Sequence, residues 1–140
     1  MNNYEQHQLK IREMKLALMQ AFPNSIRIFD RHVGLFYTVR NVPVKINKPG
    51  MCDNWAILTC FVPCIQIVVP IHLEIETKTG SGALSAKQKE WRDFCRTVGV
   101  WHFVNKNNEI LVDEIRTALV KHSLRSHANE FYTKPQEQNS

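Results

Sequence analysis

The sequence lacks the features that mark several large classes of protein. Glycine is scarce, with five in 140 residues, and charged residues make up 22%, a composition that excludes collagen-like, fibrous and intrinsically disordered chains. The polar N-terminus has no basic start followed by an apolar core, so we expect no secretory signal. No internal repeat is present. These exclusions leave one globular domain that is long enough for a full hydrophobic core.

Long apolar runs and paired cysteines are missing as well. The most apolar stretch, Ala56–Leu73, contains Pro63 and Pro70 and is shorter than the roughly 20 residues of a membrane span. We therefore interpret it as buried strands and expect no membrane partner. The four cysteines match neither the paired spacing of zinc modules nor a dense disulfide framework. We expect reduced thiols and a cytoplasmic location.

Positive charge exceeds negative charge along the chain. There are 18 lysines and arginines against 13 aspartates and glutamates, which gives a net charge of +5 and a pI of about 9.2. Such a surplus is typical of proteins that bind nucleic acid, but many small proteins carry it for solubility alone. The net charge therefore makes DNA or RNA a candidate partner, but it does not identify the function.

The first part of the chain reads as a helix followed by strands. Apolar residues at steps of three and four predict a helix over residues 3–22, which Pro23 ends. The β-branched and aromatic residues of 25–46 indicate short strands. Residues 55–69 predict two more strands, with a break near Val62 and Pro63. Residues 71–77 predict a third strand.

The second part alternates between helices and a strand. Ser85 and Gln88 form a capping box, in which each side chain satisfies a backbone N–H of the other residue. The helix that they open ends at Gly99. A strand over residues 100–104 and a helix over residues 110–121 follow.

This order of elements predicts an α/β fold with a central mixed β-sheet flanked by α-helices. We expect one domain over residues 1–125, because the periodic segments run through that range without a linker. The polar residues 126–140 are expected to form a flexible C-terminal tail.

One predicted strand holds the densest set of ionisable side chains. Because side chains alternate along a strand, Glu74, Glu76 and Lys78 share one face, together with His72. In solvent, such a face would form only weak ion pairs. The very apolar sequence around it instead indicates a central strand, where buried charges need a metal ion or a partner.

Asp53 offers a second carboxylate for the same place. It follows the turn at Pro49 and Gly50 and opens a strand that can pair with the strand of Glu76. Two carboxylates from adjacent strands, with a backbone carbonyl and waters, suit Mg²⁺ or Mn²⁺. Lys78 could then contact a phosphate or orient the attacking water. The pattern favours metal-dependent hydrolysis of a phosphodiester.

Three segments of the chain resemble the VRR-NUC group of the PD-(D/E)xK nuclease superfamily. They are Pro49–Asp53, Glu76–Gly80 and Gly82–Lys89. The acidic-x-Lys pattern alone recurs in many chains, whereas its extension into Thr-Gly, Leu-Ser and Gln is more specific. Arg31–Gly34 is similar to the segment that precedes the first carboxylate in such proteins, so the resemblance covers residues 4–119.

The resemblance implies a restriction-endonuclease-like core and an endonuclease activity. Free-standing members that are similar to this chain are phage or bacterial Holliday-junction resolvases. A homodimer that cuts branched DNA, in a bacterial or phage-infected cell, is therefore expected. Asp53 and Glu76 would hold Mg²⁺ or Mn²⁺ with the Thr77 carbonyl as a further oxygen, and Lys78 would be the catalytic lysine.

Two further catalytic assignments compete with structural ones. Gln88 would reach the site or the DNA backbone, in addition to or instead of its role in the capping box. Glu5 would be an extra acidic residue near the metal; alternatively, it is an exposed first-turn glutamate favoured by the helix dipole. Glu74 is an additional carboxylate on the active face, which could support the metal site or form an ion pair with a lysine.

Basic residues flank the predicted site and are candidates for phosphate contacts. They are Lys45, Lys48, Lys87, Lys89, Arg92 and Arg31. A solvated helix face is the alternative for Lys89 and Arg92. Two other functions stay open: a general or nicking nuclease that acts on another DNA structure, and a non-catalytic DNA-binding accessory protein whose acidic face is structural.

Overall fold

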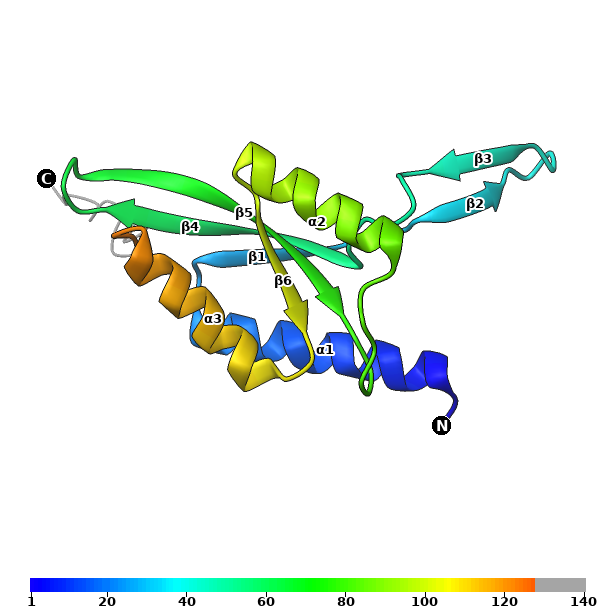
Figure 1. Ribbon diagram of the computed structural model, residues 1–140, viewed down its shortest axis with the longest axis horizontal. Helices are drawn as coiled ribbons and strands as arrows, with labels where there is room; N and C mark the ends of the chain where they lie inside the picture. The colour runs from blue at the N-terminus through cyan, green and yellow to red at the C-terminus, as the bar shows by residue number, and fades with distance from the viewer. Residues whose placement is uncertain (128–140) are drawn as a thin grey trace, which may run out of the picture.

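The computed structural model describes residues 1–127, in which three helices surround a mixed β-sheet (Figure 1). In chain order the elements are α1 Asn3–Ala21, β1 Ile26–Asp30, β2 Gly34–Tyr37, β3 Pro43–Ile46, β4 Asn54–Val62, β5 Ile67–Thr77, α2 Ala86–Val98, β6 Trp101–Asn105, α3 Asn108–Lys121 and β7 Arg125–Ser126. Within the described part of the chain, no helix is both long and apolar enough to cross a membrane.

The main sheet has the strand order β1-β4-β5-β6, and the short β7 pairs with β4. Strands β1, β4 and β5 are antiparallel, whereas β6 is parallel to β5. A parallel neighbour requires a crossover, which α2 provides. Helices α1 and α3 cover one face of the sheet, and α2 lies over the other (Figure 1). The predicted α/β class, with a mixed sheet flanked by helices, is confirmed.

The hydrophobic core lies between this sheet and the pair α1 and α3. Helix α1 contributes Ile11, Met14 and Leu18, at the predicted steps of three and four. The residues that meet them are Phe22, Ile26, Ala56, Leu58, Cys60, Leu73, Ile75, Leu111, Val112, Ile115 and Leu119. On β5, Leu73 and Ile75 point into this core, so Glu74 and Glu76 point to the α2 side, as strand alternation requires.

Strand β5 differs from the prediction, which ended a strand at residue 69 and began another at residue 71. The structure has one strand of 11 residues that runs through Pro70. Proline is tolerated there because β6 pairs only with Leu73–Thr77, which leaves one edge of β5 without a partner strand at Pro70 within residues 1–127.

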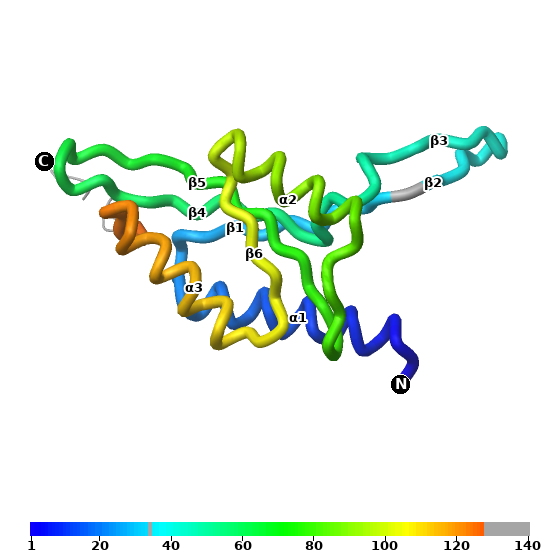
Figure 2. Tube along the Cα trace, in the orientation of Figure 1, coloured from blue at the N-terminus to red at the C-terminus, as the bar shows by residue number. Residues whose placement is uncertain are grey.

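The first residue of the predicted tail over residues 126–140 belongs to the sheet instead. Ser126 pairs with Cys60, so β7 crosses the predicted domain boundary. Residues 128–140 lie outside the described residues. The β2–β3 hairpin, by contrast, pairs with no other strand of the described chain and projects from the sheet (Figure 2).

Candidate active site

Asp53 and Glu76 meet where β4 begins and β5 ends. Their neighbours Asn54 and Ile75 are register partners in the antiparallel pair, which confirms that the two carboxylates come from adjacent strands. Asp53 Oδ2 lies 3.4 Å from the backbone nitrogen of Thr77, so the start of Thr77 lies beside this carboxylate. Glu76 is almost fully buried, while the Asp53 side chain is 34% exposed. One carboxylate is thus open to solvent and the other is not.

The turn before Asp53 packs tightly on the start of α2. Gly50 has a φ of +91°, which residues with side chains rarely adopt, and a Cβ atom there would lie 2.3 Å from the carbonyl oxygen of Lys87. Glycine therefore permits this contact. This contact holds the turn that leads to Asp53 against the first turn of α2, which carries Gln88.

Gln88 connects Glu76 to Lys78. Its Nε2 donates to Glu76 Oε1 over 2.6 Å, and its Oε1 accepts from Lys78 Nζ over 2.7 Å. Lys78 Nζ is also 3.4 Å from Glu76 Oε1. The same Gln88 Oε1 accepts from the backbone nitrogen of Ser85 over 2.9 Å, which completes the predicted capping box. The capping role and the contact with the site therefore coexist.

The surroundings of Glu76 disfavour its negative charge. Burial raises the pKa of Glu76 to about 7, and the nearby charge of Asp53 acts in the same direction, against the opposing effect of Lys78. Glu76 Oε2 is buried and has no hydrogen-bond partner among residues 1–127. A cation beside this oxygen would offset both the desolvation of Glu76 and its repulsion by Asp53.

These donors fit a hard divalent cation. Two carboxylates and a peptide oxygen are ligands that Mg²⁺ and Mn²⁺ prefer, and Mg²⁺ often takes only one or two protein carboxylates and completes its shell with water and substrate phosphate. Over residues 1–127 no group of three or more His, Cys, Asp or Glu side chains could hold a metal ion. A closed zinc-type site is therefore not formed there, whereas an open two-carboxylate site for Mg²⁺ or Mn²⁺ is compatible with the donors.

Glu5 is an exposed residue in the first turn of α1, which is the structural alternative predicted for it. It forms a capping box with Asn2, in which Glu5 Oε2 accepts from the Asn2 nitrogen over 3.0 Å and Asn2 Oδ1 accepts from the Glu5 nitrogen over 2.8 Å. Instead, His7 Nε2 lies 3.3 Å from Asp53 Oδ2. The sequence contains no signal that links His7 to Asp53, because only the packing of α1 brings them together.

Glu74 takes a structural role. Its Oε1 accepts from Arg31 Nη1 over 2.6 Å and from Trp91 Nε1 over 3.1 Å, and its Oε2 is 3.4 Å from His72 Nε2. The Glu74 side chain is fully buried and that of Arg31 is 10% exposed. Glu74 therefore forms the ion pair that was one of its two predicted roles, but with an arginine. Arg31, predicted to contact DNA, is held inside by this pair.

The thiol of Cys52 lies near the carboxylate of Glu74. It is buried and its Sγ is 3.3 Å from His102 Nε2. Burial and the charge of Glu74 raise the pKa of the Cys52 thiol, and burial lowers the pKa of His102 to about 4. Both groups are neutral near pH 7. All four cysteines are free, as predicted, although Cys64 is exposed.

The remaining predicted DNA contacts lie on β3, in the turn after it and on α2. Lys45 is on β3 and Lys48 in the turn after it, and both are exposed. Lys87, Lys89 and Arg92 are on α2. Two of these three form surface ion pairs with acidic residues of the same helix, which are weak and leave the cations able to contact phosphate.

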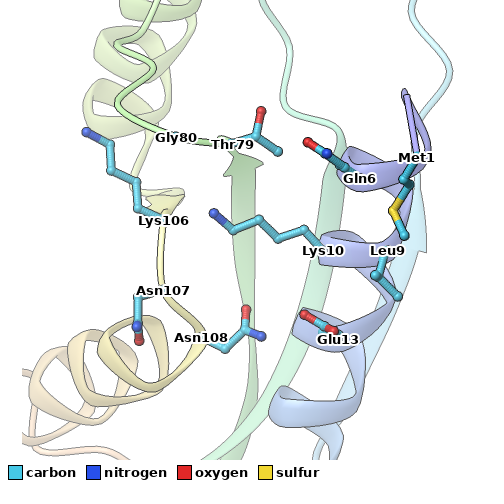
Figure 3. A pocket seen from close by; sticks show the side chains of 10 residues that line it. All are labelled: Met1, Gln6, Leu9, Lys10, Glu13, Thr79, Gly80, Lys106, Asn107 and Asn108. Carbon is cyan, nitrogen blue, oxygen red and sulfur yellow. The ribbon is translucent and has the colours of Figure 1, made fainter. Parts of the chain in front are cut away.

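A groove of about 390 Å³ adjoins the site. Two lysines that the sequence did not mark as candidates, Lys10 and Lys106, line it. One wall is the start of α1 and the other is the start of α3 with the loop before it (Figure 3). Lys10 extends from α1 and its Nζ donates to the carbonyl oxygen of Lys78. Lys106 and Asn108 lie on the opposite wall.

Comparison of the chain with protein-family models, with curated proteins and with solved structures gave no match. The functional interpretation therefore depends on the geometry of this site and on the resemblance of the sequence described above.

Proposed function

We propose that this protein is a Mg²⁺- or Mn²⁺-dependent endodeoxyribonuclease with a restriction-endonuclease-like core of the VRR-NUC type. One observation carries the proposal: Glu76, Lys78 and Gln88 are joined by hydrogen bonds and an ion pair, and the carboxylate of Asp53 lies beside them, 3.4 Å from the backbone nitrogen of Thr77. The buried, unpartnered Oε2 of Glu76 supports a cation site at this place.

Each of these residues has a separate task. When bound by Asp53, Glu76 and the Thr77 carbonyl, Mg²⁺ or Mn²⁺ supplies positive charge against the phosphodiester. Gln88 holds Glu76 Oε1, so that Oε2 is the oxygen left for the cation. Lys78 is positioned by Gln88 and carries a fixed ammonium group. It donates to a phosphate oxygen or to the attacking water, where charge develops in the transition state.

The proposed substrate is branched DNA, and the proposed enzyme is a homodimeric Holliday-junction resolvase. This narrower proposal rests on the resemblance of the sequence to such enzymes. Exposed cations on β3, on α2 and in the groove of Figure 3 support phosphate contacts on more than one side of the site. One chain offers one site, so paired cuts require two copies.

Cleavage of a labelled four-way junction in Mg²⁺ tests the site. We expect Lys78→Ala and Glu76→Ala each to slow cleavage at least about 100-fold, because each removes charge stabilisation at the phosphate. Glu114→Gln, an exposed change on α3, is the control and should leave the rate unchanged. Unchanged cleavage in both site variants would overturn the assignment. Junction binding without cleavage by the unaltered protein would favour the DNA-binding accessory protein.

The substrate is tested by comparing junction, flap and linear duplex at the same salt concentration. Symmetric paired cuts on the junction alone support a resolvase, and equal cleavage of all three supports a general nuclease. Sedimentation at micromolar concentration tests the homodimer. A monomer would contradict the resolvase and leave the nuclease proposal standing.

A further inference from the structure

Three aromatic rings lie next to one another on the face of the sheet that is turned away from α1 and α3. Phe29 of β1 stacks on Trp55 of β4, with ring centroids 4.3 Å apart and 20° between the planes. Trp55 meets the edge of His72 of β5, with centroids 5.5 Å apart. Phe29 is 38% exposed and the His72 side chain 44%. These rings therefore form an accessible aromatic row across three strands.

The aromatic row borders a cavity of about 520 Å³. Trp55 and His72 line it from the sheet. The other lining residues are Asp30, Arg31 and His32, which follow β1, and Ile46, Asn47 and Met51, which belong to the end of β3 and the turn after it. The volume falls within the range of small-molecule sites, and the lining combines rings and apolar groups with a few polar ones. Such a site suits a flat ring with hydrogen-bonding edges.

Two lysines near the cavity favour a nucleotide, whose phosphate is negative, over an uncharged ring. Lys45 and Lys48 are exposed and flank the cavity residues Ile46 and Asn47 in the sequence. Lysines this close to the lining residues in the chain can contact the phosphates of a strand whose base enters the cavity. Exposed aromatic rings bind every base, since each base has a π-face, so the site needs no particular sequence.

The cavity also lies within reach of the candidate active site. His72 and Glu76 are four residues apart on β5 and face the same side, which separates them by roughly 13 Å at about 3.3 Å per residue. A single DNA strand can cover that distance. A base in a duplex is paired and stacked on both sides, however, and cannot enter a cavity. The occupant must therefore be unpaired.

We propose that Trp55, His72 and Phe29 form a stacking site for one unpaired base of the DNA substrate, near the phosphate that is cut. The inference rests on the proposed nuclease function and narrows its substrate class. DNA with unpaired bases, such as a flap, a gap or an opened branch point, is the preferred substrate over fully paired duplex.

Binding without metal tests the stacking site independently of cleavage. Fluorescence anisotropy in EDTA is measured with a labelled oligodeoxythymidine and with a fully paired duplex of the same length. We expect Trp55→Leu and His72→Ala each to weaken binding of the single strand roughly tenfold and to leave duplex binding nearly unchanged. Ile57→Ala is the matched control, because Ile57 is exposed on the same face and does not line the cavity.

Folding of each variant is checked by thermal unfolding, and Phe29→Leu replaces Trp55→Leu if the latter unfolds. Unchanged single-strand binding, or an equal loss on single strand and duplex, would overturn the stacking site. A change from dimer to monomer in Trp55→Leu would also overturn it, since the aromatic row would then be a contact between two copies.

Cleavage in Mg²⁺ separates this inference from the proposed function. If the unaltered protein cuts DNA and the ring variants bind single strand normally, the stacking site fails and the nuclease stands. If the protein cuts no DNA but its single-strand binding depends on Trp55 and His72, the nuclease fails and the stacking site stands.

Discussion

Glu74 and Glu76 lie two residues apart on the same face of β5, and both are buried. Arg31 and Trp91 compensate Glu74 through short hydrogen bonds. Glu76 instead shares a lysine with Gln88 and lies near a second carboxylate, that of Asp53. Both glutamates keep a buried Oε2 without a hydrogen-bond partner among residues 1–127, but Glu74 Oε2 lies 3.4 Å from His72 Nε2. The difference teaches that burial of an acidic residue does not by itself mark a site. A buried carboxylate that also lies near a second carboxylate is the stronger candidate.

Removal of the arginine partner of Glu74 should have the largest effect on stability. We expect Arg31→Ala to lower the free energy of unfolding by about 3–5 kcal/mol, because it leaves a buried carboxylate without its counter-ion. Urea unfolding measures the loss. Arg27→Ala, at an exposed position on β1, is the control and should cost little. A loss no larger than that of the control would show that Glu74 is compensated by other groups.

Glu76→Gln should reduce the dependence of stability on pH. Because the pKa of Glu76 is raised from 4.5 to about 7, the folded, metal-free protein holds a proton in this range that the unfolded chain releases. Its stability should therefore fall as the pH rises from 4.5 to about 7, and the glutamine variant should lack this part of the fall. Thermal unfolding of both proteins in EDTA measures it.

Mg²⁺ should reduce the same pH dependence in the unaltered protein, since a cation favours the ionised carboxylate. Parallel stability curves of the unaltered protein and the Glu76→Gln variant in EDTA would contradict the raised pKa. Absence of any Mg²⁺ effect on the curve of the unaltered protein would contradict the metal site.

Gly50→Ala should disturb the site without removing a charge. The new Cβ would collide with the Lys87 carbonyl and push the turn of Asp53 away from α2, so we expect a loss of about 1–3 kcal/mol in stability together with slower cleavage. Gly80→Ala is the matched control: it also has a positive φ, but nothing lies within 4 Å of its Cβ. It should cost only ~1 kcal/mol. Equal effects would show that the contact with α2 is unimportant.

Glu5→Ala should have the smallest effect. Because the Glu5 carboxylate caps α1, we expect a stability loss of about 0.5 kcal/mol and cleavage within about twofold of the unaltered protein. His7→Ala should slow cleavage more, since His7 contacts Asp53. Junction cleavage rates of the two variants measure the difference. A larger loss in Glu5→Ala than in His7→Ala would return Glu5 to the active site.

Much of the fold follows from local patterns. The Ser85 and Gln88 capping box and the stop at Gly99 depend on residues within one helix, and both were predicted. Strand alternation correctly placed Glu76 and Lys78 on one face. Pro70 misled the prediction, because a proline removes one backbone donor, and whether that matters depends on a neighbouring strand that no local pattern describes.

The sequence alone determined the α/β class, both ends of α2 and the shared face of Glu74, Glu76 and Lys78, since propensity, capping and alternation act over a few residues. Only the tertiary structure decided that Glu74 pairs with Arg31, that His7 contacts Asp53 and that Lys10 reaches Lys78. These outcomes depend on desolvation and on the distance between charges. Both are set by packing between segments that are far apart in the chain.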